Sequence, residues 1–409
     1  MITDIATHDK RFPLAPGAGS DAIHRDPVYS YAVTELKDDS GHSGIGLAFT
    51  LGEGNHLVCK AASFLARDLV GKDVDELMES FGSWQCAASN EQQLRWLGPH
   101  KGVVQLALAS VTNACWDIWA KKHGVPLWQR LLDLTPEALA ATIDFSYLED
   151  VLTPSEAISV LTAARANRSE RMGILKTGYP GYDTSIGWFN YSDKQVKENV
   201  RHSVDNGFTA MKLKVGDPDM EKDLRRTEIV REGAGPDATV MVDCNQQWSV
   251  PRALEYGKQA EPFNLFWIEE PTHPDDILGH AELAKAYQPS LVAAGEHVPN
   301  RIIFKNYFRA KALGVCQVDA VRVAGVSEFL AVSLMAKKYD IPVVPHVGDM
   351  GQNHQHLVLY NHIGIGHKAL MLEHIPHLQG RFKNPCVVKD GVYQIPEEPG
   401  MSSDLLDLT

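Results

Sequence analysis

Seven short apolar runs between Gly207 and His374 each end in a polar residue, and this repetition decides the fold. The runs are Ala-Met-Lys-Leu-Lys214, Val-Met-Val-Asp243, Leu-Phe-Trp-Ile-Glu269, Leu-Val-Ala-Ala-Gly-Glu296, Cys-Gln-Val-Asp319, Val-Val-Pro-His346 and Leu-Met-Leu-Glu373. Their last residues are spaced by 23 to 29 positions, the length of one strand, one loop, one helix and a return loop. The stretch therefore predicts a repeated strand–helix unit.

Helical patterns fill the intervals between the runs. Apolar residues recur at helical spacing in residues 217–232, 250–261, 277–287, 302–313 and 327–339. Strands alternating with amphipathic helices predict an α/β protein with a parallel sheet, which closes most simply as a barrel. A single charged strand end is explained equally well by contact with solvent. Seven in register predict a shared active-site mouth at the C-terminal ends of the strands.

The bulk properties fit a soluble globular enzyme and exclude some partners. The chain has 409 residues, of which 44% are hydrophobic and 22% charged, and its formal net charge is −13. Because phosphate binding needs a basic surface, this charge argues against nucleic acid and against an anionic membrane. Six scattered cysteines without a Cys-x-x-Cys motif indicate a reducing compartment. With no leader-like N-terminus and no long apolar run, a cytoplasmic location is expected.

The remaining sequence predicts a second, smaller domain. Alternating runs at residues 2–11, 30–37 and 44–50 indicate a β-meander, and residues 57–132 have a helical period. We expect an α+β capping domain in residues 1–140 and a barrel in residues 141–375. The tail, residues 376–409, should return to pack on the cap. Residues 177–188, rich in glycine and aromatic side chains, are expected to form a loop that could close over a ligand.

Three carboxylates on successive strand ends predict a metal site. Asp243, Glu269 and Glu296 offer only oxygen ligands, which favours Mg²⁺, or Mn²⁺, over zinc. Without a cation the three groups would repel one another and raise their own pKa values. A bound divalent ion would relieve that repulsion.

Two further sets of residues predict proton transfer. Lys212 and Lys214 lie two apart on one strand and so share a face, and neighbouring positive charge should lower the pKa of one of them enough for it to act as a base. His346 and Asp319 end neighbouring runs, so the carboxylate could hold the imidazole as an acid or base. A structural role is expected for most of the other histidines in this region: His354, His356, His362, His367 and His377.

Together these groups predict abstraction of a proton α to a carboxylate. The metal would bind the substrate carboxylate and stabilise the enediolate, and bases would flank the α-carbon. The carbon acid is too weak for a bare lysine, so several kcal/mol of metal stabilisation is the enabling step.

At this point the motifs resemble the enolase superfamily, mandelate racemase subgroup. They are Lys212-Leu-Lys214, Val-Asp243-Cys-Asn245, Trp-Ile-Glu269-Glu-Pro, Gly-Glu296-His, Gln-Val-Asp319 and Pro-His346. Longer stretches, such as Gly-Ser-Asp21-Ala and Ile-Gly-Trp188-Phe-Asn-Tyr-Ser-Asp193, are similar to the L-fuconate dehydratase family within that subgroup. The likeness covers nearly the whole chain.

The resemblance implies a modified (β/α)₇β TIM-type barrel with an α+β capping domain. It implies Mg²⁺ at Asp243, Glu269 and Glu296, and acid/base roles for Lys214 and for His346 paired with Asp319. Lys212 is expected to contact the substrate carboxylate. Three further substrate-binding residues are implied: Asp21, Asn245 and Glu373.

The chain departs from the family pattern just after His346. Asp349 and Met350 stand where similar enzymes carry small residues, and the segment Gln352-Asn-His-Gln-His356 is unusual, as is Val323-Ala-Gly325. These positions are expected on the pocket wall rather than in the metal set.

The expected activity is a Mg²⁺-dependent dehydration of a sugar acid, with L-fuconate as the first choice. Related aldonic acids (L-galactonate, D-arabinonate) and racemisation or epimerisation of a 2-hydroxy acid are the alternatives, and a non-catalytic barrel is a third class. The expected partners are this small molecule and further copies of the chain in a homo-oligomer.

Overall fold

Strands of the repeated unit pair in parallel around a barrel in the computed structural model, which describes residues 1–408. Hydrogen bonding follows the order β4-β5-β6-β7-β8-β9, and β10 pairs back on β4. The chain is therefore an α/β protein with a modified (β/α)₇β barrel and a capping domain, as expected. The barrel strands are β4 (Tyr179–Gly187), β5 (Ala210–Lys214), β6 (Thr239–Asp243), β7 (Trp267–Glu269), β8 (Leu291–Ala294), β9 (Val315–Cys316) and β10 (Leu372–His374).

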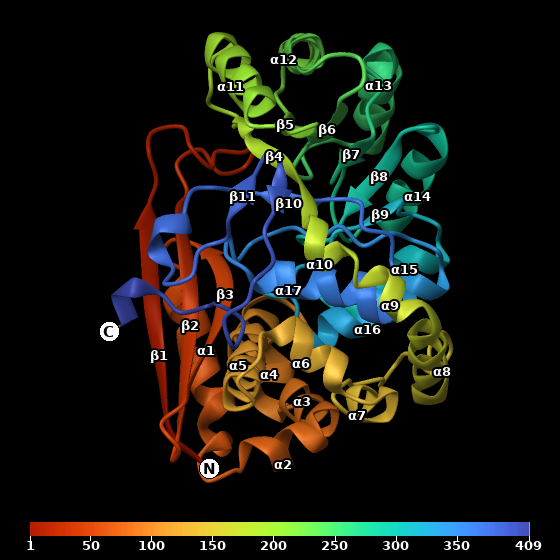
Figure 1. Cartoon of the computed structure of the whole chain (residues 1–409). Coiled ribbons are helices and arrows are strands. Elements are labelled where there is room, and N and C mark those ends of the chain that lie inside the picture. Colours follow the sequence, from red (N-terminus) through yellow and green to blue (C-terminus); the bar gives the residue numbers. More distant parts are fainter. Residues whose placement is uncertain (409) are drawn as a thin grey trace.

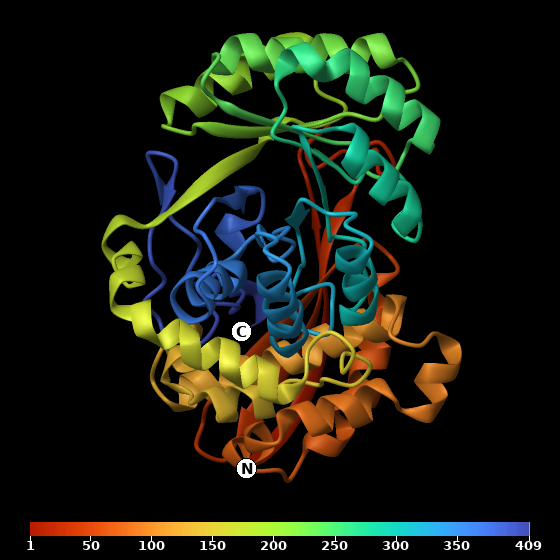
Figure 2. The same cartoon turned by 90° about the vertical axis from the view of Figure 1, so that its right-hand side faces the viewer.

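Helices lie between the strands close to their predicted positions. Those of the barrel are α11 (Asp193–Asp205), α12 (Met220–Ala234), α13 (Val250–Ala260), α14 (Ile277–Ala286), α15 (Arg301–Arg309), α16 (Val326–Lys338) and α17 (Asn353–Tyr360). Figure 2 shows the green α11–α13 region at the end of the molecule opposite the orange N-terminal helices. The hydrophobic period predicted α12 to α15 because each of these helices buries one face and exposes the other. By contrast, α16 and α17 are buried on nearly all sides.

Two predictions about strands were wrong. The run ending at His346 forms only an isolated bridge, from Val343 to Cys316, because Pro342 and Pro345 lack the N–H that a strand ladder requires. The expected loop at residues 177–188 is mostly β4, which pairs with β5, β10 and the C-terminal hairpin. Its glycines lie in a strand because neighbouring groups approach closely, as at Gly181 beside Phe208 and Tyr393.

A layer of apolar side chains fills the barrel interior. Its fully or almost fully buried members come from six strands and from two segments that complete the ring: Tyr182, Ala210, Met241, Trp267, Ala293, Val315, Val344 and Met371. Successive side chains of a strand alternate between faces, so the residue two positions further along points into the same interior. The next layer therefore contains polar residues such as Thr184, Lys212 and Asp243, and it stands on an apolar floor.

The N-terminal part forms an antiparallel sheet with helices packed against it (Figure 1). The sheet contains β1 (Ile2–Pro13), β2 (Val28–Asp38) and β3 (Ser43–Leu51), which confirms the predicted meander. The helices that follow are α1 (Asn55–Ala66), α2 (Val74–Glu79), α3 (Phe81–Ser89), α4 (Gln92–Leu97), α5 (Gly102–Lys122), α6 (Leu127–Asp133), α7 (Pro136–Ala141), α8 (Pro154–Ala164), α9 (Arg168–Arg171) and α10 (Ile174–Thr177). The predicted boundary between residues 140 and 141 stays a prediction.

The C-terminal tail contacts both parts of the molecule. Its hairpin, β11 (Val388–Lys389) and β12 (Val392–Tyr393), extends the sheet at β4. Phe382 and Leu405 join the apolar cluster beneath the N-terminal sheet, and the Trp128 indole donates to the carbonyl of Pro396 at 2.9 Å. Across residues 1–408, no helix is both long and apolar enough to cross a bilayer.

Close packing of β3 on α5 depends on a glycine. A Cβ atom at Gly46 would overlap the carbonyl oxygen of Ser110 and the amide nitrogen of Ala114. Both neighbours are backbone atoms of a buried helix, so they cannot move aside cheaply.

We predict that Gly46→Ala destabilises the protein by about 3 kcal/mol, because overpacking a dense interface costs this order of free energy. Chemical denaturation measures the change. Gly54→Ala is the matched control, since a Cβ there meets no atom within 4 Å, and it should alter stability by less than about 0.5 kcal/mol. Equal effects of the two substitutions would contradict the packing argument.

Candidate active site

The predicted strand-end residues meet in one buried cluster above the apolar floor. The Lys212 ammonium donates to Glu269 Oε1 at 2.7 Å and lies 2.8 Å from Glu373 Oε1. The Lys214 ammonium donates to Asp243 Oδ2. Since these side chains come from four different strands, the cluster exists only because the barrel is closed.

The expectation of a lysine with a lowered pKa is wrong for the protein without a metal ion. Burial is the largest influence and would lower the pKa of Lys214, as would repulsion from Lys212. The carboxylates of Asp243, Glu296 and Asp21 together outweigh both, so the pKa is raised. For Lys212, burial is likewise outweighed by Glu269 and other carboxylates, and its pKa is raised well above the ordinary value. The prediction counted the neighbouring ammonium group but not the closer carboxylates.

Asp243, Glu269 and Glu296 form a group that could hold a metal ion. One carboxylate oxygen from each lies within 4.8 Å of the others. Burial, and then the charges of Asp243 and Glu373, raise the pKa of Glu269 to about 8 despite the neighbouring Lys212. Oxygen Oε2 of Glu296 is buried without a hydrogen-bond partner among the described residues. A hard divalent cation fits this donor set, because it would satisfy the orphaned oxygen and the excess negative charge.

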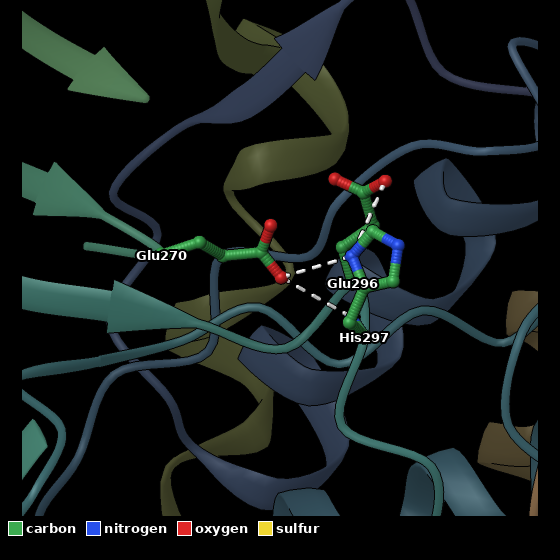
Figure 3. Close-up of side chains that lie close together, drawn as sticks. All are labelled: Glu270, Glu296 and His297. Carbon is green, nitrogen blue, oxygen red and sulfur yellow. Dashed lines mark hydrogen bonds and ion pairs between the residues drawn. The ribbon is translucent and has the colours of Figure 1, made fainter. Parts of the chain in front are cut away.

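A second group shares Glu296 with Glu270 and His297 (Figure 3). The Glu270 carboxylate already accepts a hydrogen bond from the Gln246 amide, and its Oε1 lies 3.1 Å from His297 Nδ1. This second group offers two carboxylates and an imidazole, and two of its members, Glu270 and His297, already bind each other. The all-oxygen group therefore fits Mg²⁺ better.

His346 and Asp319 form the predicted pair. Nδ1 of His346 lies 2.6 Å from Asp319 Oδ2, and Nε2 lies 3.6 Å from Glu296 Oε2. Burial would lower the pKa of His346, but Glu296 and Asp319 together raise it to about 9. The aspartate fixes Nδ1 as the bonded nitrogen, so Nε2 faces the metal group and the cavity.

A cavity of about 430 Å³ connects these groups to the cap. Lys214, Glu296, His346 and Glu373 line one side of it. The remaining lining residues come mainly from the N-terminal sheet and its loop, from β4 and from the segments that follow His346 and Glu373: Gly19, Asp21, Tyr29, Phe49, Leu51, Thr184, Trp188, Met350 and Ile375. Asp21 thus lines the same cavity as Lys214 and His346, the candidate proton-transfer residues.

The expected substrate-binding residues Glu373, Asp21 and Asn245 form different hydrogen bonds. Glu373 accepts a hydrogen bond from the Thr184 hydroxyl at 2.6 Å. Oδ1 of Asp21 accepts from the backbone N–H groups of Ile23 and His24 at 2.7 and 2.6 Å, which fixes its carboxylate in a turn. Asn245 is buried and binds Asp243 Oδ1 through its backbone N–H at 3.0 Å. It is not among the described residues that line the cavity.

Several site residues escaped the sequence reasoning. Gln317 donates to Glu269 Oε2 at 2.7 Å, and Trp267 donates to the same oxygen at 3.0 Å. Gln317 lies two residues before Asp319, so the strand period could have placed it in the site. Thr184 and Trp188 were hidden by the mistaken loop at residues 177–188.

This fold and site define a known class. Residues 4–132 match the model of the mandelate racemase / muconate lactonizing enzyme N-terminal domain, and residues 195–407 match that of the enolase C-terminal domain-like family. The chain belongs to the mandelate racemase and muconate lactonizing enzyme family of the enolase superfamily.

Particular relatives are similar over almost their whole length. Mitochondrial enolase superfamily member 1 of Homo sapiens is 42% identical over 99% of this chain and 93% of its own. Its crystal structure matches with a TM-score of 0.95 at 40% identity, covering 99% and 94% of the two chains. The L-galactonate dehydratase of Hypocrea jecorina is 42% identical over 99% and 92%.

A solved structure with a ligand is also similar. The L-talarate/galactarate dehydratase of Salmonella typhimurium LT2, liganded with Mg and L-lyxarohydroxamate, matches with a TM-score of 0.77 at 27% identity. The match covers 99% of this chain and 90% of that one.

We predict that His346 makes the stability of the metal-free protein depend on pH. A histidine with a raised pKa stabilises the folded state fully below its unfolded pKa, about 6.5, and loses this contribution as pH rises towards 9. Urea unfolding of the wild type and of His346→Gln should therefore differ by an amount that falls by up to about 3 kcal/mol across this window. A difference independent of pH would contradict the assignment.

Proposed function

We propose that the protein is a Mg²⁺-dependent dehydratase of a sugar acid, with L-fuconate as the preferred substrate. The observation that carries the proposal is the common cavity lined by Lys214, Glu296 and His346. Two groups able to transfer a proton and one carboxylate of the candidate metal group line the same space, which supports the proposal. Relatives named as dehydratases of L-galactonate, L-talarate/galactarate and arabinonate support the reaction class.

Asp243, Glu269 and Glu296 would hold the ion. When bound, Mg²⁺ supplies positive charge that stabilises the substrate's enediolate and offsets the carboxylate attraction that keeps Lys214 protonated. Lys212 is held between Glu269 and Glu373, where its ammonium can contact the substrate carboxylate. Its raised pKa keeps it a cation rather than a base.

Lys214 and His346 then divide the proton transfers. Lys214 takes the C2 proton, and the C–H electron pair moves towards the carboxylate to give the enediolate. The pair then returns to form the C2–C3 double bond as the C3–O bond breaks. His346 gives its Nε2 proton to the departing 3-hydroxyl, which leaves as water. The enol product tautomerises to a 2-keto-3-deoxy acid, 2-dehydro-3-deoxy-L-fuconate in the case of L-fuconate. The raised pKa of His346 suits the acid role because the imidazole carries a proton at neutral pH.

The lining of the cavity favours a monocarboxylic acid with an apolar end. Among the lining residues of the described chain, Lys214 is the one lysine or arginine, so a second substrate carboxylate would lack a cationic partner. Four lining side chains are apolar and come from outside the metal group: Phe49, Leu51, Met350 and Ile375. L-Fuconate and L-galactonate have the same configuration and differ only at C6, which is a methyl in the former. The apolar wall fits that methyl better than a hydroxyl.

We predict that Mg²⁺ binding depends on the all-oxygen group. Mg²⁺ at a hundredfold excess over its Kd should raise the free energy of unfolding of the wild type by about 2.7 kcal/mol. Asp243→Asn should abolish most of this gain, whereas Glu270→Gln, which removes a ligand only from the second group, should retain it. Chemical denaturation and calorimetric titration with Mg²⁺ measure both variants. The reverse pattern would move the ion to Glu270 and His297.

We predict a ranking of substrates in a panel of four- to six-carbon sugar acids assayed for keto-acid release with Mg²⁺. L-Fuconate should exceed L-galactonate in kcat/KM by about tenfold or more, because an unpaired buried hydroxyl costs about 1–3 kcal/mol, and diacids such as galactarate should be poorest. Lys214→Ala and His346→Asn should lose at least about 100-fold in kcat. If the wild type released no keto acid from any member, the proposed function would be abandoned.

A further inference from the structure

The unusual residues that follow His346 lie directly behind the His346–Asp319 pair. His354 Nε2 lies 3.1 Å from Asp319 Oδ1, the oxygen opposite the one that faces His346. His354 Nδ1 forms a hydrogen bond with Asp349 Oδ1. The result is an unbroken row of side chains from the metal group inwards: Glu296, His346, Asp319, His354 and Asp349.

The inner end of this row is rigid. Asp349 Oδ2 accepts from the backbone N–H groups of Gly351 and Asn353 at 3.0 and 2.9 Å, at the start of α17. The Tyr31 hydroxyl, on strand β2 of the N-terminal sheet, donates to the Asp349 carbonyl at 2.5 Å. His354 itself is completely buried. The capping sheet and α17 therefore both fix the position of the imidazole.

The charges favour an imidazolium at His354. Burial would lower its pKa, but Asp319 and Asp349 outweigh burial and raise the pKa to about 10. In that form both ring nitrogens donate, one to each carboxylate. The Ala320 N–H also lies 2.9 Å from Nε2, but a protonated Nε2 has no lone pair to accept it, so in the imidazolium form the partner of Nε2 is Asp319. A buried carboxylate between two imidazoles is electrostatically balanced, which matches the lowered pKa of Asp319, where burial is outweighed by His354 and His346.

We propose that His354, anchored by Asp349, is a positioning residue that holds the Asp319 carboxylate and through it aims His346 at the substrate. The proposal rests on the proposed role of His346 in dehydration. It replaces the structural role expected for His354 from the sequence. It also assigns a purpose to the departures at Asp349 and His354: they support the acid rather than line the pocket.

Two substitutions at position 354 separate this role from simple packing. The amide nitrogen of glutamine can stand in for imidazole Nε2 and keep the contact with Asp319. The amide nitrogen of asparagine can stand in for Nδ1 and keep only the contact with Asp349. We expect His354→Asn to lower kcat by about 100-fold with little change in KM, because misplacement of a catalytic group costs this order of rate. His354→Gln should stay within about tenfold of the wild type.

His356 supplies the matched control. His356 is equally buried on the same helix, but it lies outside the row, and its Nδ1 accepts from the backbone N–H of Trp128 at 3.4 Å. His356→Gln and His356→Asn should change kcat equally little. Melting temperatures of all four variants show whether each is folded.

A readout without substrate or metal keeps this proposal separate from the proposed function. The Nδ1–H proton of His346, in its 2.6 Å hydrogen bond to Asp319, should give a low-field NMR resonance that is assigned by its loss in His346→Asn. We expect this resonance in the wild type, in His354→Gln and in both His356 variants, and its shift or loss in folded His354→Asn. An unchanged resonance in His354→Asn would overturn the proposal, as would a kcat for His354→Asn equal to or above that of His354→Gln. If the panel yields no substrate, the NMR result alone decides.

Discussion

The structure depends on the electrostatic balance of charges buried above the apolar floor of the barrel. Asp243, Glu269 and Glu373 are almost completely buried, and each is paired with Lys212 or Lys214. Unpaired carboxylates in such a place would become protonated or destabilise the fold. The lysines balance part of this charge in the protein without an ion, and the raised pKa of Glu269 shows that the balance is incomplete. A divalent cation would complete it.

The two parts of the molecule contribute differently to the cavity. Strands and strand ends of the barrel hold the metal group and the proton-transfer residues, because parallel strands bring their C-terminal ends to one rim. The N-terminal sheet contributes Tyr29, Phe49 and Leu51 to the cavity lining. Under the proposed function, the barrel would supply the reacting groups, and the cap and the segments after His346 and Glu373 would select among sugar acids.

The row from Glu296 to Asp349 links these two parts. Its outer end lies at the metal group, and its inner end is fixed by the Tyr31 hydroxyl of the capping sheet. Asp319 therefore contacts two imidazoles. His346 belongs to the barrel, and the position of His354 depends in part on the cap. The orientation of the His346 imidazole is therefore a property of the assembled molecule rather than of one loop.

The sequence by itself determined the repeated unit, because strand and helix periods are local properties that each apolar face imposes on its own segment. It also determined the strand-end residues Lys214, Asp243 and Glu269, since a period of two carries the interior face to the end of each strand. Glu296 lies beyond the end of β8, and the spacing of the repeated unit indicated it. Three features were decided only by the tertiary structure. They are the pairing that makes residues 179–187 a strand, the contact of His354 with Asp319, and the raised pKa values of Lys212 and Lys214. Each of these features depends on groups that are remote in sequence. Strand β4 needs β5 and β10 to pair with, and His354 needs Asp319 in the loop after β9. The lysine pKa values depend on carboxylates of other strands. Long-range contacts decide pairing and electrostatics, and no local pattern encodes them.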